Sequence, residues 1–268
     1  MQTIKTPVTY YGGKQRLASK IIQMLPEHNL YAEPFCGGAA VFFLKPKSNV
    51  EVLNDTNREL INFYEVVQND FVSLEKEIRI SLHSRDMHRR AKVIYENPDM
   101  FSSLKRAWAV WVLSAQSFSA KLGDAWGYDV KKRTTSVKIK NKRDSFTEDY
   151  GIRLQDVQLE CTDAIRVIKW RDRPDSFFYC DPPYFNSDCG HYDGYTVEDF
   201  EMLLKALEQI EGKFLLSSYP SPLLEEYTKR NGWYQESLEQ QVSVNNRGTT
   251  RKKKVEVFTA NYPLTLPK

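Results

Sequence analysis

Two kinds of apolar pattern alternate at both ends of the chain. Apolar residues recur at helical spacing over residues 14–25, ahead of short apolar runs at 30–32 and 50–53. Residues 54–57 supply capping side chains for a further helix that extends to Val67. The alternation returns near the C-terminus, with strands predicted at 157–159, 177–180 and 213–217 and helices at 163–168 and 197–210. This order predicts an α/β fold with a mainly parallel sheet.

The middle of the chain has a different pattern. Residues 70–116 are predicted to form successive helices, whereas residues 117–150 are rich in glycine, aromatic and basic residues without a clear helical period. We therefore predict a mostly helical insert with borders near residues 68 and 150. Within it, Leu104, Trp108 and Trp111 recur at helical spacing, which favours a place in the core over a ligand-stacking face.

The composition is that of a folded soluble protein. Of the 268 residues, 41% are hydrophobic and 27% are charged, so both one domain with a large insertion and two domains are open at this length. The cysteines are too few and too irregularly spaced for a disulfide framework or a pair of zinc knuckles, and we expect reduced thiols. The N-terminus lacks the apolar stretch of a signal peptide, and no apolar run approaches the roughly 18 residues of a membrane span. These features indicate a cytoplasmic protein.

Basic charge is concentrated in two short stretches. Residues 131–143 hold seven lysines and arginines, residues 247–254 hold five, and the rest of the chain has a formal net charge of −9. Such a distribution favours a surface that binds nucleic acid phosphates. An alternative stays open, because apolar and basic residues alternate over 135–142, as in a half-buried edge strand protected by lysines.

A loop of small residues follows the first predicted strand. Residues 33–40 read Glu-Pro-Phe-Cys-Gly-Gly-Ala-Ala, which matches neither a Walker loop nor the dinucleotide fingerprint. Asp55 ends the next strand, near the distance at which α/β nucleoside sites place an acid for ribose hydroxyls. Together the loop and the acid suggest a nucleoside cofactor. Taken alone, the loop is equally a strand-to-helix turn, and Asp55 is equally a helix cap.

A second informative segment follows the apolar run at 177–180. It reads Asp181-Pro182-Pro183-Tyr184, so two prolines hold the backbone beside a carboxylate and an aromatic ring. The segment lies where open α/β sheets bind ligands, at the carboxyl end of a strand. This position favours a reactive site over a simple proline turn.

In order and spacing, these segments resemble the Dam-type (alpha-group) adenine-specific DNA methyltransferases, which depend on S-adenosyl-L-methionine. Besides the two segments just described, the resemblance rests on Tyr-Tyr-Gly-Gly-Lys at 10–14 and on Leu-Asn-Asp-Thr-Asn at 53–57. Residues 157–163, 212–218 and 247–256 are similar to the family's later motifs. The resemblance implies a Rossmann-like catalytic domain formed by residues 1–67 and 151–268. Residues 68–150 then form a target-recognition insert that binds DNA and carries a hairpin.

The implied activity is transfer of a methyl group from S-adenosyl-L-methionine to the 6-amino group of an adenine flipped out of double-stranded DNA. The implied setting is the cytoplasm of a bacterial cell or a phage-infected host, with the protein a monomer or a weak dimer. A cognate restriction endonuclease fits this setting as a partner. Two alternatives stay open: a cytosine-N(4) DNA methyltransferase, and a non-catalytic DNA-binding protein on the same scaffold. RNA is a further possible substrate.

The chemistry assigns roles to the matching residues. Asp181 and the Pro182 carbonyl are suited to accept the two amino hydrogens, and Tyr184, together with Phe185, is suited to stack on the flipped base. By the resemblance, the catalytic residues are Asp181, Pro182, Pro183 and Tyr184, and the cofactor-binding residues are Tyr10, Lys14, Glu33, Phe35, Gly37, Gly38, Asp55, Cys161, Asp163 and Asp181. No metal is expected, because Cys189 and His191 lack enough partners for zinc.

The insert departs from the family pattern. Family members that read GATC have an arginine after a Phe-Ser pair, whereas Phe118-Ser119 is followed here by residues without one. We therefore do not predict GATC as the target. The expected DNA-binding residues are Ser119, Lys121, Trp126, Tyr128, Lys131, Lys132, Arg133, Arg247 and Arg251. Lys121 is suited to a guanine edge, Trp126 and Tyr128 either stack on DNA or pack the hairpin, and the basic residues contact phosphates.

Overall fold

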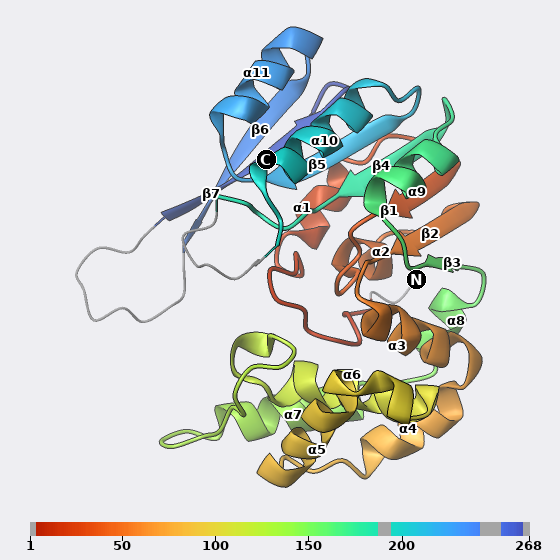
Figure 1. Cartoon of the computed structure of the whole chain (residues 1–268), viewed down its shortest axis with the longest axis vertical. Coiled ribbons are helices and arrows are strands. Elements are labelled where there is room, and N and C mark those ends of the chain that lie inside the picture. The colour runs from red at the N-terminus through yellow and green to blue at the C-terminus, as the bar shows by residue number, and fades with distance from the viewer. Residues whose placement is uncertain (1–3, 187–193, 242–252, 265–268) are drawn as a thin grey trace. The chain divides into compact units, whose positions relative to one another are not determined.

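The structure is a computed structural model that describes residues 4–186, 194–241 and 253–264. It divides into two compact units, each assembled from several stretches of chain. One unit contains residues 1–22, 36–47 and 53–161, and we call it the helical unit. The other contains residues 23–35, 48–52 and 162–268, and we call it the sheet unit. Figure 1 labels the elements of both.

A mixed sheet of seven strands, in the order β3-β2-β1-β4-β5-β7-β6, provides the framework. In the sheet unit, β1 pairs in parallel with β4, and β4 with β5, while β7 runs antiparallel to both β5 and β6. All five residues of β4 are buried, as expected for a central strand covered on both faces. The strands are β1 (Leu30–Glu33), β2 (Val50–Asn54), β3 (Gln158–Glu160), β4 (Ser176–Cys180), β5 (Lys213–Ser218), β6 (Tyr234–Gln241) and β7 (Lys253–Ala260).

Three helices pack on one face of this sheet (Figure 1). They are α9 (Ala164–Arg171), α10 (Val197–Glu208) and α11 (Pro222–Asn231). Their apolar sides meet strand residues such as Phe178 and Leu216 in one buried cluster. Each helix begins at a capping side chain, and that of α10 forms a full capping box between Thr196 and Asp199. Local capping and burial against the sheet therefore specify the same helices.

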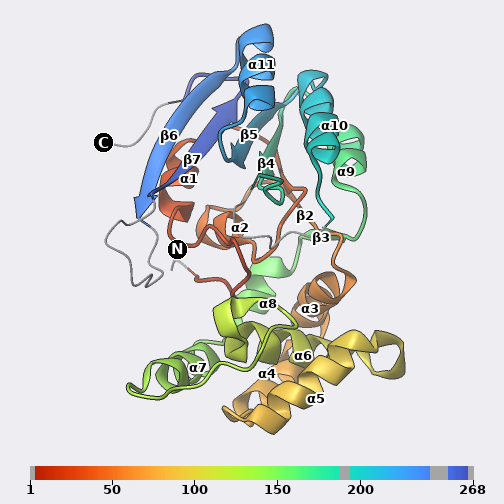
Figure 2. The same ribbon diagram turned by 60° about the vertical axis from the view of Figure 1, so that its left-hand side comes forward.

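The helical unit is organised around α6 (Ser103–Gln116), which packs against α3, α4, α5 and α7 (Figure 2). Trp111 is fully buried and Trp108 is 8% exposed, which confirms the predicted core role of these side chains. The other helices of this unit are α1 (Ala18–Gln23), α2 (Ala40–Leu44), α3 (Arg58–Asn69), α4 (Phe71–Arg79), α5 (Arg85–Glu96), α7 (Thr134–Asp144) and α8 (Asp149–Leu154), with short 3₁₀ turns at Pro98–Met100 and Phe118–Ala120.

The interpretation of residues 135–142 as an edge strand is wrong, because they lie within α7. The Asp129 carboxylate accepts hydrogen bonds from the backbone amides of Thr135 and Ser136, at 2.7 and 2.9 Å, and so satisfies amides in the first turn of the helix. Ile139 is buried whereas Val137 is 45% exposed, so the alternating apolar residues do not share one face. The expected hairpin is present as a single antiparallel bridge between Ser117 and Trp126.

Other differences concern boundaries and the C-terminal strands. The helix expected over 14–25 is confined to α1, preceded by a turn in which the Leu17 amide donates to the Lys14 carbonyl. The remaining predicted strands and helices are present within a few residues of their expected ends. The antiparallel pair β6 and β7 had no clear sequence signal, because its residues carry mixed polar and apolar positions along the edge of the sheet.

Candidate functional site

The glycine loop of the helical unit is packed against Tyr10. Gly37 has a φ of +47°, and a Cβ atom built there would lie 3.0 Å from the Tyr10 ring. At Gly38 a Cβ atom would lie 3.3 Å from the Tyr10 Cβ and equally close to the Val8 carbonyl. The fold itself therefore requires small residues in this loop, since they admit the Tyr10 segment.

Asp55 is held by the backbone on both of its carboxylate oxygens. The Gly37 amide donates to Oδ2 at 3.0 Å and the Asn57 amide to Oδ1 at 2.9 Å. Burial raises the pKa of Asp55, and these two amide donors act in the opposite direction. The cap of α3 is Asn57, whose side chain accepts from the Glu59 and Leu60 amides, so the alternative of Asp55 as helix cap is excluded.

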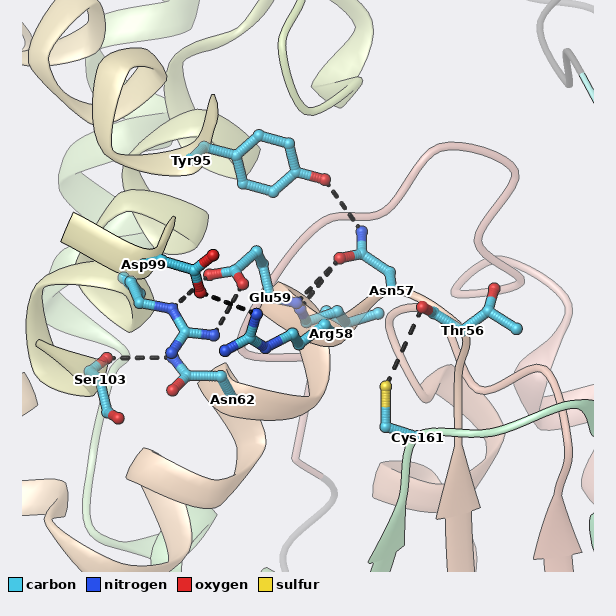
Figure 3. A network of polar contacts seen from close by, with 11 residues as sticks. Thr56, Asn57, Arg58, Glu59, Asn62, Tyr95, Asp99, Ser103 and Cys161 are labelled. Atoms are coloured by element: carbon cyan, nitrogen blue, oxygen red, sulfur yellow. Dashed lines mark hydrogen bonds and ion pairs between the residues drawn. The ribbon is translucent and has the colours of Figure 1, made fainter. Parts of the chain in front are cut away.

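Asn57 also links two tyrosine hydroxyls, of which Figure 3 shows that of Tyr95. Its Nδ2 donates to the Tyr95 hydroxyl at 3.1 Å and to the Tyr10 hydroxyl at 3.4 Å. Burial and the negative charge of Asp55 raise the pKa of Tyr10, so this phenol stays neutral. Sequence reasoning missed Tyr95, because nothing in the local pattern of α5 relates it to a residue on a distant helix.

Two further expected cofactor residues lie in the same unit. Lys14 is 8% exposed, and its ammonium donates to the Gly12 carbonyl at 3.3 Å. Cys161 follows β3 with an exposed thiol whose Sγ lies 4.0 Å from the Thr56 carbonyl oxygen (Figure 3). Partial desolvation and the negative charge of Asp55 raise the pKa of Cys161, which keeps it a thiol.

In the sheet unit, Glu33 is the last residue of β1 and Phe35 follows the strand. Glu33 is 2% exposed and accepts a hydrogen bond of 2.6 Å from the Tyr31 hydroxyl. The Phe35 ring meets Tyr195 edge-on with centroids 6.4 Å apart. Asp163 is the N-cap of α9, where it accepts from the Arg166 amide at 3.1 Å. Capping accounts for Asp163 structurally, and its cofactor role stays a prediction.

The Asp-Pro-Pro-Tyr segment leaves the carboxyl end of β4 and turns back on itself. The Tyr184 hydroxyl donates to Asp181 Oδ1 at 3.1 Å, and its ring meets Tyr219 edge-on at a centroid distance of 4.4 Å. The same hydroxyl lies 3.2 Å from Ser217 Oγ and forms a short hydrogen bond to Glu256. Partial burial and the two neighbouring carboxylates raise the pKa of Tyr184 well above its ordinary value.

Glu256 is the functional candidate that sequence reasoning named only within a motif. It is 5% exposed on β7 and accepts a hydrogen bond of 2.6 Å from Ser217, which is fully buried on β5. In the sequence Glu256 lies between two valines of a segment for which no strand was predicted. Its partner was not visible, because β5 and β7 pair only in the folded sheet.

The hairpin of the helical unit stacks two of the expected DNA-binding rings on each other. Trp126 and Tyr128 lie 5.6 Å apart at an interplanar angle of 17°, and the Tyr128 side chain is 57% exposed. The Arg85 guanidinium from the start of α5 lies 4.6 Å from the Trp126 ring and 5.6 Å from that of Tyr128. Ser119 donates to Asp124 at 3.2 Å, and Lys121 is half-buried at the bend. Sequence reasoning missed Arg85.

The basic residues of the stretch 131–143 differ in their exposure to solvent. Lys131, Lys132 and Arg133 are exposed ahead of α7. Lys142 instead turns inward and donates to the Ser114 carbonyl at 3.4 Å, and burial lowers its pKa to about 7. Arg247 and Arg251 lie outside the described residues. Among the residues that the structure describes, no cluster of potential metal ligands and no helix able to cross a membrane is found.

A mainly parallel sheet, an anchored aspartate after β2 and Asp-Pro-Pro-Tyr after β4 together define a Rossmann-like methyltransferase. The chain belongs to the D12 class N6 adenine-specific DNA methyltransferases, because the model of that family matches residues 10–240. It is thus an adenine-specific DNA methyltransferase, and the expected family resemblance is confirmed.

Individual relatives agree with this family. The chain is 28% identical to the type II methyltransferase M1.LlaDCHI of Lactococcus lactis subsp. cremoris, over 94% of this chain and 93% of that protein. It is 26% identical to the DNA N-6-adenine-methyltransferase of Escherichia phage P1, over 90% of this chain and 33% of that longer protein. A DNA adenine methylase of Salmonella typhimurium is 24% identical over 94% and 93% of the two chains.

Proposed function

We propose that the methyl donor is S-adenosyl-L-methionine and that the acceptor is an adenine flipped out of a specific sequence in double-stranded DNA. Residues 68–150 then provide the target-recognition insert, and residues 1–67 and 151–268 the catalytic domain. The observation that carries the cofactor proposal is the Asp55 carboxylate, held by the Gly37 and Asn57 amides. An ionised carboxyl group has about four acceptor sites, so two backbone donors leave capacity for two ribose hydroxyls.

The residues around Asp55 fit the rest of this cofactor. The glycine loop brings backbone close to Asp55, which suits the methionine portion, and the buried ammonium of Lys14 suits a carboxylate. Tyr10, held by Asn57 and packed on the loop, forms a rigid wall beside them. When bound, S-adenosyl-L-methionine supplies a methyl group attached to positively charged sulfur. Glu33, Phe35, Cys161 and Asp163 complete the proposed cofactor-binding set.

Asp181 is the main catalytic residue in the proposed mechanism. The adenine amino nitrogen is a weak nucleophile because its lone pair is delocalised into the ring. If Asp181 and the Pro182 carbonyl accept the two amino hydrogens, the nitrogen is oriented and the positive charge that develops on it is stabilised. Pro182 is buried and Pro183 half-buried, so the turn that presents these acceptors is rigid.

Aromatic rings are available at the same place to hold a flipped base. Tyr184 and the half-buried Tyr219 meet edge-on at the ends of β4 and β5. Phe185 is occupied in the core, where its ring contacts Phe200 at 5.2 Å. Tyr184 and Tyr219 are thus the proposed stacking residues, since an extruded base is commonly held between aromatic side chains.

The proposed DNA surface is the hairpin together with the start of α7. The exposed Lys131, Lys132 and Arg133 supply phosphate contacts that fix register without reading sequence. Ser119, Lys121, Trp126 and Tyr128, with Arg85 stacked over the two rings, supply groups able to reach base edges. Arg247 and Arg251 extend the proposed phosphate contacts in a part of the chain outside the described residues. The type II names of relatives support a cognate restriction endonuclease as partner, in the cytoplasm of the host.

The experiment compares wild type with Asp181→Ala in cells that lack DNA methylation. Genomic DNA is sequenced by a method that distinguishes N6-methyladenine from N4-methylcytosine. We expect N6-methyladenine in one short motif for wild type and none for the variant. Absence of any modified base from wild-type cells, despite cofactor binding by the purified protein, contradicts the proposal.

Titration with S-adenosyl-L-methionine distinguishes the proposed roles of the Asp181 and Asp55 carboxylates. Asp181→Ala is expected to bind S-adenosyl-L-methionine within a few-fold of wild type while turnover falls by a factor of about a hundred or more. Asp55→Ala is the matched variant, which is expected to lose cofactor affinity first. If Asp181→Ala weakened cofactor binding but turned over normally, the assigned role of Asp181 would be wrong.

A further inference from the structure

Trp126 is the centre of a small aromatic cluster in the hairpin of the helical unit. Its indole N–H donates to Gln116 Oε1 at 3.3 Å. Its ring centroid lies 4.8 Å from that of His83 and 5.6 Å from that of Tyr128. The indole is half-buried, whereas the Tyr128 side chain stacked on it is exposed. Trp126 is therefore held in place on several sides, and together with Tyr128 it forms a fixed aromatic platform.

The exposed Arg85 side chain places its guanidinium over this platform. The guanidinium carbon lies 4.6 Å from the centre of the Trp126 ring and 5.6 Å from that of Tyr128. A cation is attracted by the π-electrons of aromatic rings, and this contact uses none of its N–H donors. Among the residues that the structure describes, none accepts a hydrogen bond from Arg85 and none forms an ion pair with it. The rings thus position Arg85, and its five N–H donors stay available for a ligand.

The start of α5, which carries Arg85, is tied to the hairpin by hydrogen bonds. Gln116 is fully buried at the end of α6, and its Oε1 accepts from the Ser84 amide at 3.2 Å. The His83 ring donates to the Gly127 carbonyl at 2.8 Å. Helices α5 and α6 pack side by side behind these contacts (Figure 2). The backbone on which Arg85 stands is therefore fixed against the platform, so little ordering of this side chain remains to be done on binding.

A positioned guanidinium suits a ligand that offers two acceptors side by side, because its donors form a planar fork. On double-stranded DNA such pairs are phosphate oxygens and the O6 and N7 atoms of guanine in the major groove. The other bases present at most one acceptor there. Lys131, Lys132 and Arg133 are the proposed phosphate contacts and stand in a run of exposed cations. Arg85 instead is held by rings that sit in the hairpin, which favours recognition of a base edge.

We propose that Arg85 is a specificity-determining residue that recognises a guanine of the target sequence from the platform of Trp126 and Tyr128. This inference rests on the proposed function of the hairpin as part of the DNA surface. The reading group comes from α5, whereas the rings that hold it come from the hairpin. Arg85 belongs to neither the proposed cofactor site nor the catalytic segment. Its loss is therefore expected to relax the choice of DNA sequence and to leave cofactor affinity unchanged.

The first test is the sequence selectivity of Arg85→Met in cells that lack DNA methylation. Methionine keeps an unbranched stem over the rings and removes every donor. We expect wild type to methylate adenine in a motif that contains a G·C pair. We expect Arg85→Met to accept other pairs at one such position, with methylation of those sites at least about tenfold above wild type. A wild-type motif without a G·C pair, or the same motif in the variant, overturns the proposal.

Binding to synthetic duplexes tests the contact itself, without turnover. Each guanine of the motif is replaced in turn by 7-deazaguanine, which lacks the N7 acceptor and keeps normal base pairing. We expect one of these replacements to weaken binding by wild type about tenfold and binding by Arg85→Met less than about twofold. Equal sensitivity of the two proteins to every replacement contradicts a contact between Arg85 and guanine.

Arg89→Met is the matched control. Arg89 is an exposed arginine on the same helix, but it binds the Asp86 carboxylate at 2.7 Å, as does Arg90. We expect this variant to keep the wild-type motif and the wild-type sensitivity to 7-deazaguanine. Urea unfolding and the affinity for S-adenosyl-L-methionine are expected to be the same in wild type and both variants, since each replaced side chain is exposed.

A phosphate contact by Arg85 gives a different result. Arg85→Met then weakens binding to all sequences equally and lowers the slope of log affinity against log salt concentration by about 0.9, which overturns guanine recognition. Failure of the proposed function is distinguishable from failure of this inference. Wild-type protein that forms no N6-methyladenine removes both, whereas an active wild type with unchanged selectivity in Arg85→Met removes only the role of Arg85.

Discussion

Asn57 performs three tasks, two with its side chain and one with its backbone amide. Its carbonyl oxygen caps α3, its amide nitrogen joins Tyr10 to Tyr95, and its backbone amide holds Asp55. The proposed ribose acceptor Asp55, the Tyr10 wall of the proposed cofactor site and helix α5 are therefore connected through one residue. A change at Asn57 is expected to act on both stability and cofactor affinity.

Two substitutions separate these effects. Asn57→Ala removes the cap and the amide donor, so the free energy of unfolding is expected to fall by about 1 kcal/mol and cofactor affinity to drop about fivefold. In Asn57→Ser the hydroxyl still caps the helix but does not reach the tyrosines. We expect near-normal stability with the same loss of affinity, measured by urea unfolding and by calorimetric titration. Normal affinity in Asn57→Ser would show that the tyrosine contacts do not support the site.

Lys142 is expected to make stability depend on pH. Its pKa is lowered to about 7 by burial and by Lys138, whereas an unfolded lysine titrates at about 10.4. Below pH 7 both states are protonated, and the folded state carries the full cost of the buried charge. Between these two pKa values the folded state has lost its proton and the unfolded state has not, so the cost declines as pH rises.

Replacement of Lys142 by methionine tests the direction of this pH dependence of stability. Lys142→Met is expected to raise the free energy of unfolding more at pH 6 than at pH 9. Lys140→Met, at an exposed position on the same helix, is the control and is expected to change stability little at either pH. An equal gain for Lys142→Met at both pH values would rule out the pKa shift as the cause.

At the scale of elements, α3 and α6 are joined by a buried ion pair. Arg106 donates to both Glu59 oxygens, at 2.7 and 2.8 Å, and the two side chains are 10% and 8% exposed. Because α6 is the central helix of its unit, this pair links the segment that carries Asp55 to the core of the helical unit. Neither partner was identified from the sequence, where Glu59 is an ordinary acid in a first helical turn.

Replacing one partner of this ion pair is expected to lower the free energy of unfolding more than replacing both partners. Arg106→Leu leaves the Glu59 carboxylate buried without its partner, which typically lowers the free energy of unfolding by about 3–5 kcal/mol. The double change to leucine at both positions removes the uncompensated charge and is expected to recover much of that loss. Urea denaturation of the two single variants and the double variant measures the coupling. Additive losses would show that the pair contributes nothing as a pair.

At the scale of the whole molecule, basic charge on an otherwise acidic chain is expected to govern DNA affinity. Changing Lys131, Lys132 and Arg133 to alanine is expected to weaken binding to all sequences about equally. The slope of log affinity against log salt concentration should fall by about 2 to 3, since each phosphate contact contributes about 0.9. Alanine at exposed lysines on other elements provides the control, with changes at Lys20, Lys169 and Lys229. A loss confined to one sequence would show that the basic triplet reads bases.

The elements that the sequence predicted correctly are those specified by interactions between residues close together in the chain. Strands β1, β2, β4 and β5 and helix α10 lie where apolar spacing and capping residues predicted them, because both signals act within a few residues. The error at α7 has the same origin. Apolar and basic residues alternate over 135–142 as they do in a strand. In the structure these residues form a helix, and the Asp129 carboxylate accepts hydrogen bonds from amides in its first turn.

Local sequence decided the order of the elements, the side-chain caps of helices such as α3 and α10, and the motifs that identify the family, because spacing and side-chain chemistry are properties of neighbouring residues. Folding decided which distant side chains meet. Tyr95 reaches Asn57 across 38 residues and Glu256 reaches Tyr184 across 72. Contacts of this kind depend on how helices pack and strands pair, and a single sequence carries no local signal for them. Motifs therefore locate Asp55 and Asp181, whereas packing supplies the distant side chains around them.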